Sequence, residues 1–147
     1  KGKEIVFTTT NGTNAIEQSR GCKTLLIGAF SNINALAKKC IEIGGRIVVV
    51  CAGWNNRINM EDTLFGGAFA EKLFNENPPK LDSDAVKIAL ELWQSAKHDL
   101  LNYLKDSEHY QRLIDNKAEG DAPFCLQQNT VNLVPYYDKV DKKLKIY

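Results

Sequence analysis

Two adjacent carboxylates, Glu61 and Asp62, are the residues of this sequence whose types and spacing most directly suggest chemistry. Carboxylate oxygens are ligands that Mg²⁺ accepts, and a bound Mg²⁺ usually keeps several waters as well. A structural role is the alternative. Acidic residues in the first turn of a helix each stabilise it by about 0.3–1 kcal/mol, and Asn59 can cap such a helix. The pair predicts a magnesium site or a helix start, and the residues alone leave both open.

Three segments rich in hydroxyl, amide and glycine residues follow predicted strands and form the candidate anion site. They contribute Thr10, Asn11, Gly12, Thr13, Ser31, Asn32, Gly53 and Arg57. Ligands of a parallel sheet bind beyond the carboxyl ends of its strands, and the start of a helix presents free N–H groups to an anion. The segments therefore predict phosphate binding, with simple helix capping by Thr and Asn as the alternative.

The third of these segments also has a cysteine and an arginine at the spacing found in cysteine-dependent phosphatases. Cys51 and Arg57 are separated by five residues, directly after a predicted strand. In those enzymes the thiolate is the nucleophile and the arginine holds the phosphate. They also place Ser or Thr after the arginine, whereas Ile58 follows here. We therefore expect Cys51 to be a packed strand residue and keep the thiolate mechanism as an alternative.

His109 is the histidine placed to take part in chemistry. It opens a short predicted helix next to a long irregular segment, and it can bind phosphate or transfer a proton near neutral pH. Capping or a surface role is an equal alternative. His98 lies between Lys97 and Asp99 on the polar side of a predicted helix, which is typical of a solvated histidine.

The first part of the chain alternates strands and helices, and so predicts the elements that would position these residues. We expect strands over 4–9, 23–28 and 46–51, and helices over 13–20 and 32–43. The continuous β-branched run in 46–51 is typical of a strand buried on both faces of a parallel sheet. The fold class expected is α/β, a three-layer sandwich with a mainly parallel or mixed sheet.

The second half is predicted to be rich in helices. Apolar spacing indicates helices over 61–74, 84–105 and 107–115, then an irregular segment and a terminal hairpin formed by 133–137 and 143–147. Gly66 and Gly67 lie inside the first of these helices, where each costs about 1 kcal/mol relative to Ala. Close approach of another backbone would explain that cost, and a tolerated weakness of the helix is the alternative.

Composition excludes several classes of protein. The chain has 147 residues, 44% of them hydrophobic, and a net charge of +1, which is typical of one globular domain. The charge balance argues against a nucleic-acid partner, which needs a basic excess. No apolar run approaches the ~20 residues of a membrane span. Four cysteines without metal-ligand spacing indicate reduced thiols and a cytoplasmic protein.

Taken in order, several short motifs resemble the 2-phosphosulfolactate phosphatase family. The matching residues are 9–13, 30–32, 51–53, 61–64 with Gly67, 107–109 with Leu113, and Asp121, Cys125, Val134 and Pro135. They span nearly the whole chain. Each motif is weak by itself, but the ordered set is fairly specific.

The resemblance implies a Mg²⁺-dependent enzyme that removes phosphate from 2-phospho-3-sulfolactate, a step in coenzyme M synthesis. It implies that Glu61 and Asp62 hold the metal or its bound water, and that residues 10–13 form the phosphate loop. His109 and Asp62 are the candidate catalytic residues, and Arg57 is a candidate for the second anion of the substrate. The nucleophile stays open between metal-activated water and a residue elsewhere in the protein.

The family also has an N-terminal half with an Asp-x-x-Arg-Ala-Thr/Ser motif, which this sequence lacks. We therefore expect residues 1–147 to be a single α/β domain, the C-terminal half of a two-part phosphatase, with the N-terminal half as its partner. A homo-oligomer is also possible on this interpretation. The rival hypotheses are a non-catalytic anion-binding module and a dimerisation module.

Overall fold

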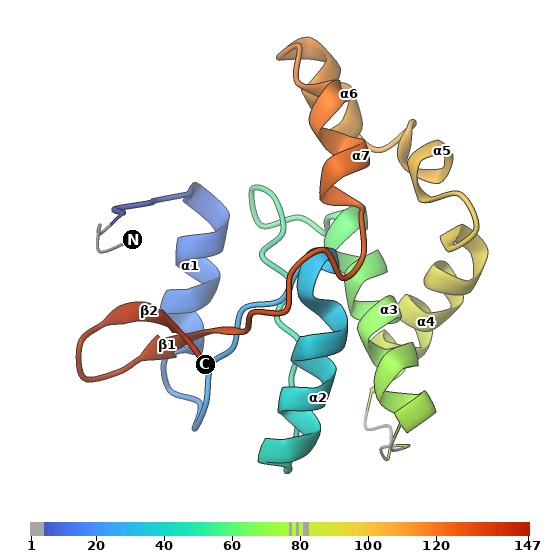
Figure 1. The fold of residues 1–147 in the computed structure, drawn as a ribbon. Coiled ribbons are helices and arrows are strands. Elements are labelled where there is room, and N and C mark those ends of the chain that lie inside the picture. The colour runs from blue at the N-terminus through green and yellow to red at the C-terminus, as the bar shows by residue number, and fades with distance from the viewer. Residues whose placement is uncertain (1–4, 77, 79, 81–82) are drawn as a thin grey trace.

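The computed structural model describes residues 5–76, 78, 80 and 83–147, and shows a mixed α and β chain that is mostly helical (Figure 1). The α-helices are α1 (Thr10–Ser19), α2 (Ile33–Ile43), α3 (Met60–Glu76), α4 (Asp84–Ala96), α5 (Leu100–Leu104), α6 (Glu108–Asp115) and α7 (Ala122–Cys125). Short 3-10 turns are η1 (Phe30–Asn32) and η2 (Glu119–Asp121), and the strands are β1 (Pro135–Asp138) and β2 (Lys143–Ile146). The helix-rich second half is thus confirmed.

The core lies where α3 packs between α2 and α4 (Figure 1). Its most deeply buried large side chains are Ile33 of α2 and Leu64 of α3. A Cβ atom at Gly67 would lie 2.0 Å from the carbonyl oxygen of Ala89 in α4. Only glycine allows the two helix backbones to approach so closely, which confirms the explanation that the sequence suggested for this residue.

Side-chain caps decide where the helices begin. Ser83 accepts the N–H of Ala85 and caps α4. The single helix predicted over 84–105 is wrong, because α4 ends at Ala96 and α5 begins after Asp99. The Asp99 carboxylate accepts the N–H of Asn102 and so starts a new helix, a local competition that apolar spacing does not reveal.

The predicted strands are formed only in part. Residues 5–9 and 46–51 are not strands, and residue 4 lies outside the described part. The burial expected for 46–51 is wrong, since Val48 is 69% and Val50 53% exposed. Cys51, expected to be a packed strand residue, is likewise exposed and outside any strand. The three-layer sandwich is not seen among the described residues. A ladder needs a neighbouring strand, and a β-branched run shows only that its side chains suit a sheet, not where the partner strand lies.

The terminal hairpin is confirmed as β1 and β2, paired antiparallel with Tyr136 opposite Lys145. The strand predicted over 23–28 is not formed as a strand; Leu26 makes one isolated antiparallel bridge with Tyr136 of β1. There the N–H of Ile27 donates to the Pro135 oxygen at 2.8 Å, and the N–H of Tyr137 donates to the Leu25 oxygen at 3.0 Å. Within the described residues, no helix combines the length and the apolar character needed to cross a membrane.

Candidate functional site

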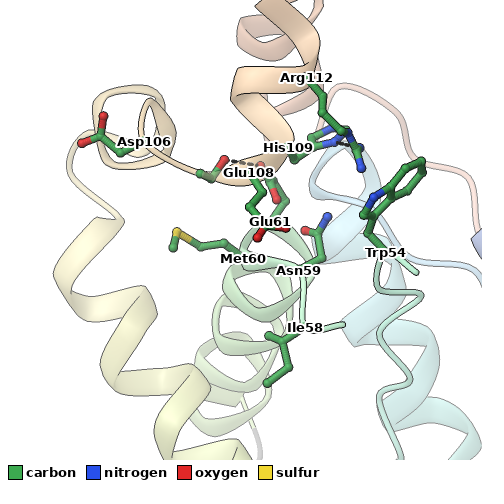
Figure 2. Close-up of a pocket in the computed structure, with 10 residues that line it drawn as sticks. Trp54, Ile58, Asn59, Met60, Glu61, Asp106, Glu108, His109 and Arg112 are labelled. Carbon is green, nitrogen blue, oxygen red and sulfur yellow. Dashed lines mark hydrogen bonds between the residues drawn. The ribbon is translucent and has the colours of Figure 1, made fainter. Parts of the chain in front are cut away.

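A pocket of about 230 Å³ lies between the start of α3 and the start of α6 (Figure 2). Two short segments complete it, the loop before α3 and the two residues that precede α6. The pocket is lined by Trp54, Ile58, Asn59, Met60, Glu61, Asp106, Ser107, Glu108, His109 and Arg112. It therefore combines carboxylates, an imidazole, a guanidinium and an indole in one small volume, which suits a small charged ligand.

Glu61 has one carboxylate oxygen that lacks a partner. Its Oε1 accepts the hydroxyl of Ser107 at 3.0 Å, and the Ser107 oxygen in turn accepts the N–H of Tyr110 at 3.1 Å. The same serine thus caps α6 and holds Glu61. The Oε2 atom of Glu61 is buried and has no hydrogen bond within the described residues. A buried, unpaired carboxylate oxygen costs free energy, so it points to a cation, a proton or another polar ligand.

A tight turn brings Trp54 to the pocket and carries Arg57 beside it. Trp54 and Arg57 bond each other's backbone, with N–O distances of 3.1 and 2.8 Å. The two central residues, Asn55 and Asn56, have φ angles of 49° and 59°. Two successive residues at positive φ are typical of a type I′ turn, for which asparagine is well suited. The turn places Arg57 Nη1 3.6 Å from Oε1 of Glu108, a residue that lines the pocket.

Arg112 connects this turn to His109. Its Cζ atom lies 3.5 Å from the centre of the Trp54 ring, and its Nη2 donates to Nδ1 of His109. Because a guanidinium only donates, Nδ1 carries no proton, and the neutral imidazole holds its proton on Nε2. His109 is therefore set up as a hydrogen-bond donor through Nε2. The sequence prediction missed Trp54, Ser107 and Arg112, although the spacing of His109 and Arg112 on one helix face was a usable signal.

Asp62 does not share the position of Glu61. Its Oδ2 accepts the N–H of Gly53 at 2.7 Å, and its own N–H donates to Oδ1 of Asn59 at 3.2 Å. Asn59 therefore caps α3, as the sequence indicated, and Asp62 braces the loop before it. Asp62 is not among the residues that line the pocket. The metal and catalytic roles predicted for Asp62 stay predictions.

The carboxylates of the pocket are compatible with one loosely held Mg²⁺. Among the described residues no group of three or more His, Cys, Asp or Glu side chains is arranged to hold a metal ion. Mg²⁺, however, commonly uses one or two carboxylates and completes its shell with waters and substrate phosphate. The buried Oε2 of Glu61 suits one such ligand position, and Asp106 and Glu108 line the same pocket.

A family model for 2-phosphosulpholactate phosphatase matches residues 1–140. The chain belongs to this family. It is 34% identical over 146 residues to a protein of Clostridium botulinum (strain Alaska E43 / Type E3). The matched residues make up 99% of the chain and 60% of that relative. A protein of Symbiobacterium thermophilum is 31% identical over 137 residues, 93% of the chain and 59% of the relative. Both are named "Probable 2-phosphosulfolactate phosphatase".

The resemblance to the 2-phosphosulfolactate phosphatase family is thus confirmed. The chain spans about 60% of the length of the relatives it matches. Among the predicted site residues, Glu61 and His109 come together in the pocket, with Gly53 and Arg57 in the adjoining loop and turn.

The candidate phosphate loop of this family member lies elsewhere, at the start of α1 (Figure 1). Thr10, Asn11, Gly12 and Thr13 form the first turn, and none of them lines the pocket. The Thr9 hydroxyl accepts the N–H of Thr13, and the Thr13 hydroxyl donates to the Thr9 carbonyl. These contacts fit capping, which was the alternative left open, and phosphate binding by the loop stays a prediction.

Ser31 and Asn32, the other predicted anion ligands, belong to η1 and also lie outside the pocket. Asn32 is buried, and its side chain accepts the N–H of Ala29 at 2.9 Å. Its amide group donates to the carbonyls of Ile27 and Leu133, which ties η1 to the segment before the hairpin. These bonds give Asn32 a structural role, and binding by either residue stays a prediction.

The cysteine mechanism finds little support in the geometry of this family member. Loss of hydration and, secondarily, the charge of Asp62 raise the pKa of the Cys51 thiol. A nucleophilic cysteine needs the opposite shift. The loop would also need free N–H groups, but those of Gly53, Trp54 and Arg57 already donate to acceptors within the chain.

Proposed function

We propose that the full-length protein is a Mg²⁺-dependent phosphomonoester hydrolase of 2-phospho-3-sulfolactate, and that the pocket between α3 and α6 is its reaction site. The observation that carries this proposal is the buried, unpartnered Oε2 of Glu61, a residue of the pocket that His109 and Arg112 also line. Family membership supplies the reaction class, since the relatives are named as probable phosphatases. We extend the proposal to a role in coenzyme M synthesis and to a cytoplasmic location.

Four of the pocket residues have a definite part in this proposal. Glu61 is held in place by Ser107 and presents Oε2 as the metal ligand. The bound Mg²⁺ would neutralise phosphate charge and lower the pKa of a coordinated water. His109 donates from Nε2 to an oxygen of the phosphate, because Arg112 occupies its Nδ1. Phosphoryl transfer depends mainly on positioning and charge neutralisation, which this set of groups supplies.

The test compares two glutamine substitutions in the full-length protein. Glu61→Gln keeps an oxygen that accepts the Ser107 hydroxyl but removes the charge. Glu91→Gln makes the same change on the exposed side of α4. We expect Glu61→Gln to lose phosphate release by about 100-fold or more, and to lose Mg²⁺ binding in calorimetry. Glu91→Gln should behave as wild type. If Glu61→Gln keeps its turnover and its Mg²⁺ affinity, the proposal is wrong.

We also propose that the rest of the protein completes a sheet with segments 5–9 and 46–51, giving the three-layer arrangement expected from the sequence. Two observations support this. Ile5, Val6 and Val48 are 87%, 98% and 69% exposed, and the relatives are longer than the chain. Parallel pairing would give the unpaired backbone groups of these segments their partners.

Mixing experiments test this second proposal. Residues 1–147 and the separately expressed N-terminal portion should each be inactive, and mixing them should restore phosphate release. Full activity of residues 1–147 alone, or a stable homodimer that does not exchange with the added portion, would overturn the proposal. Phosphate binding by the mixture without turnover would favour the rival anion-binding module.

A further inference from the structure

A cation without an acidic partner lies at one side of the pocket. The guanidinium of Arg112 stacks on the Trp54 ring and gives one N–H to His109. Within the part of the chain that the structure describes, no carboxylate forms an ion pair with Arg112. A guanidinium has five N–H donors in a planar fork. Most of its donors, and its whole charge, are therefore left for a ligand.

Arg57, the arginine that the sequence suggested for a second anion, is placed differently. The Arg57 side chain is 72% exposed. Its Nη1 lies 3.6 Å from Oε1 of Glu108, and this carboxylate offsets the charge of the guanidinium. Arg57 is also absent from the residues that line the pocket, whereas Arg112 is one of them. Indole stacking restricts the Arg112 side chain, so less conformational entropy is lost when it binds a ligand.

The charges of the pocket are distributed unevenly. Figure 2 shows Trp54 and Arg112 on one side, Asp106 on the other, and Glu61 between them. A phosphate bound through a metal at Glu61 would leave the Arg112 side for another part of the substrate. A sulfonate suits that position, because it is always ionised, and its oxygens match the fork of a weakly hydrated guanidinium.

We propose that Arg112, stacked on Trp54, selects substrates that carry a sulfonate in addition to the phosphate. This inference rests on the proposed function of the pocket and adds a specificity-determining residue that the sequence did not indicate. Arg112 acts on binding of the sulfonate group, so its loss should raise the KM of the sulfonated substrate far more than it changes the turnover of a substrate without that group.

The test uses the full-length protein, Mg²⁺, and two substrates, 2-phosphosulfolactate and 2-phospholactate, which lacks the sulfonate. Arg112→Gln should lower kcat/KM for the sulfonated substrate about 10- to 100-fold more than that for 2-phospholactate, whose own loss measures the part that Arg112 plays through His109. Arg112→Lys keeps the positive charge but lacks the planar set of N–H donors of a guanidinium. Its kcat/KM for the sulfonated substrate should lie between those of Arg112→Gln and wild type. Arg20→Gln, at the end of α1, is the matched control and should leave the ratio of the two values unchanged.

An equal loss for both substrates would overturn the inference, because Arg112 would then act only on a shared group or through His109. The inference is also overturned if Arg112→Gln keeps full activity and the wild-type ratio of kcat/KM values for the two substrates. A wild-type protein that hydrolyses neither compound would contradict the proposed function instead. In that case calorimetry with 3-sulfolactate and lactate decides the inference: selective binding of 3-sulfolactate must disappear in Arg112→Gln, and equal binding by wild type and variant overturns it.

Discussion

Gly66 and Gly67 are neighbours in α3 with opposite surroundings. A Cβ at Gly67 would meet the Ala89 carbonyl at 2.0 Å and the Trp93 Cβ at 2.8 Å. A Cβ at Gly66 would find only a Val49 methyl, at 4.0 Å. The packing of α3 on α4 therefore depends on one of these glycines and not on the other.

We predict that Gly67→Ala lowers the free energy of unfolding by about 2–3 kcal/mol, because the backbones of α3 and α4 must separate. Gly66→Ala should raise it by about 0.5–1 kcal/mol through helix propensity. Chemical denaturation of both variants measures the difference. Similar effects of the two substitutions would contradict the close approach of the helices.

Cys51 supplies a second prediction at the level of single residues. Its thiol pKa is raised, and the neighbouring N–H groups are already bonded. We predict that Cys51→Ser in the full-length protein retains substantial phosphatase activity, within about 10-fold of wild type. Steady-state kinetics and a thermal melt check it. A loss of about 10⁴-fold with unchanged stability would establish the thiolate mechanism.

Residue types identified part of the candidate site in advance. Glu61 and His109, which both line the pocket, were suggested because a carboxylate can bind a metal ion and an imidazole can transfer a proton. Arg112 and Trp54 were not, because their role depends on a turn with two asparagines at positive φ, Asn55 among them, that brings the indole to α6. Chemistry can be inferred from residue types, but a contact between distant segments cannot.

Among the elements, helices were easier to predict than strands. A helix forms its hydrogen bonds within itself, so the apolar spacing of 61–74 was enough to indicate α3. One helix was predicted over 84–105 because its apolar stripe is continuous. The chain forms two helices there because Asp99, within that stripe, caps a new one. The strands predicted over 4–9 and 46–51 would need partner strands, and a run of β-branched residues does not identify such partners.

Glu71 joins α3 to α4 through several hydrogen bonds. Its carboxylate accepts from Trp93 Nε1 and Gln94 Nε2, both at 2.7 Å, and from Lys97 Nζ at 2.9 Å. Loss of hydration raises the pKa of Glu71, but these donors outweigh it and lower the pKa to about 2. The carboxylate is therefore charged whenever the two helices are packed at ordinary pH.

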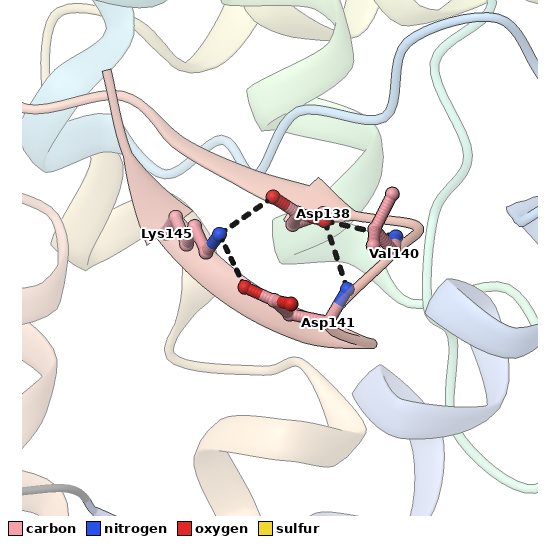
Figure 3. A network of polar contacts seen from close by, with 4 residues as sticks. All are labelled: Asp138, Val140, Asp141 and Lys145. Atoms are coloured by element: carbon pink, nitrogen blue, oxygen red, sulfur yellow. Dashed lines mark hydrogen bonds and ion pairs between the residues drawn. The ribbon is translucent and has the colours of Figure 1, made fainter.

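The hairpin has a comparable network at its turn (Figure 3). Asp138 accepts from Lys145 Nζ at 2.7 Å and from the N–H groups of Asp141 and Val140 at 3.0 and 2.9 Å. The bond from Lys145 and those from the backbone lower the pKa of Asp138 to about 2, and Asp138 and Asp141 raise the pKa of Lys145. The turn between β1 and β2 thus has an acid-sensitive carboxylate of its own.

Both carboxylates have pKa values lower in the folded chain than the value of about 4 expected after unfolding. Their contribution to stability is therefore complete above about pH 5 and is lost as the pH falls towards about 2. We predict that Glu71→Gln lowers the free energy of unfolding near neutral pH by about 1–3 kcal/mol and flattens its dependence on pH in this range. Denaturation curves at a series of pH values measure it, with Glu91→Gln as the control. An unchanged pH slope in Glu71→Gln would contradict the role of this carboxylate.

For the whole molecule, the segment 46–51 should behave differently in isolation and in the full-length protein. Its β-branched side chains are exposed, and no strand ladder protects its backbone within the described residues. We predict that its amide protons exchange rapidly in residues 1–147 alone and slow by about 100-fold or more when the remaining portion is added. Hydrogen exchange followed by mass spectrometry measures this. Rapid exchange in both samples would contradict completion of a sheet.

The same exposed run also bears on how the isolated chain behaves in concentrated solution. Residues 47–50 are four consecutive uncharged β-branched side chains without proline, a composition that favours cross-β stacking between copies. Arg46 is the charged residue beside them and acts as a gatekeeper against that stacking. The residues suited to complete a native sheet are thus also those most able to start an amyloid-like one when the rest of the protein is missing.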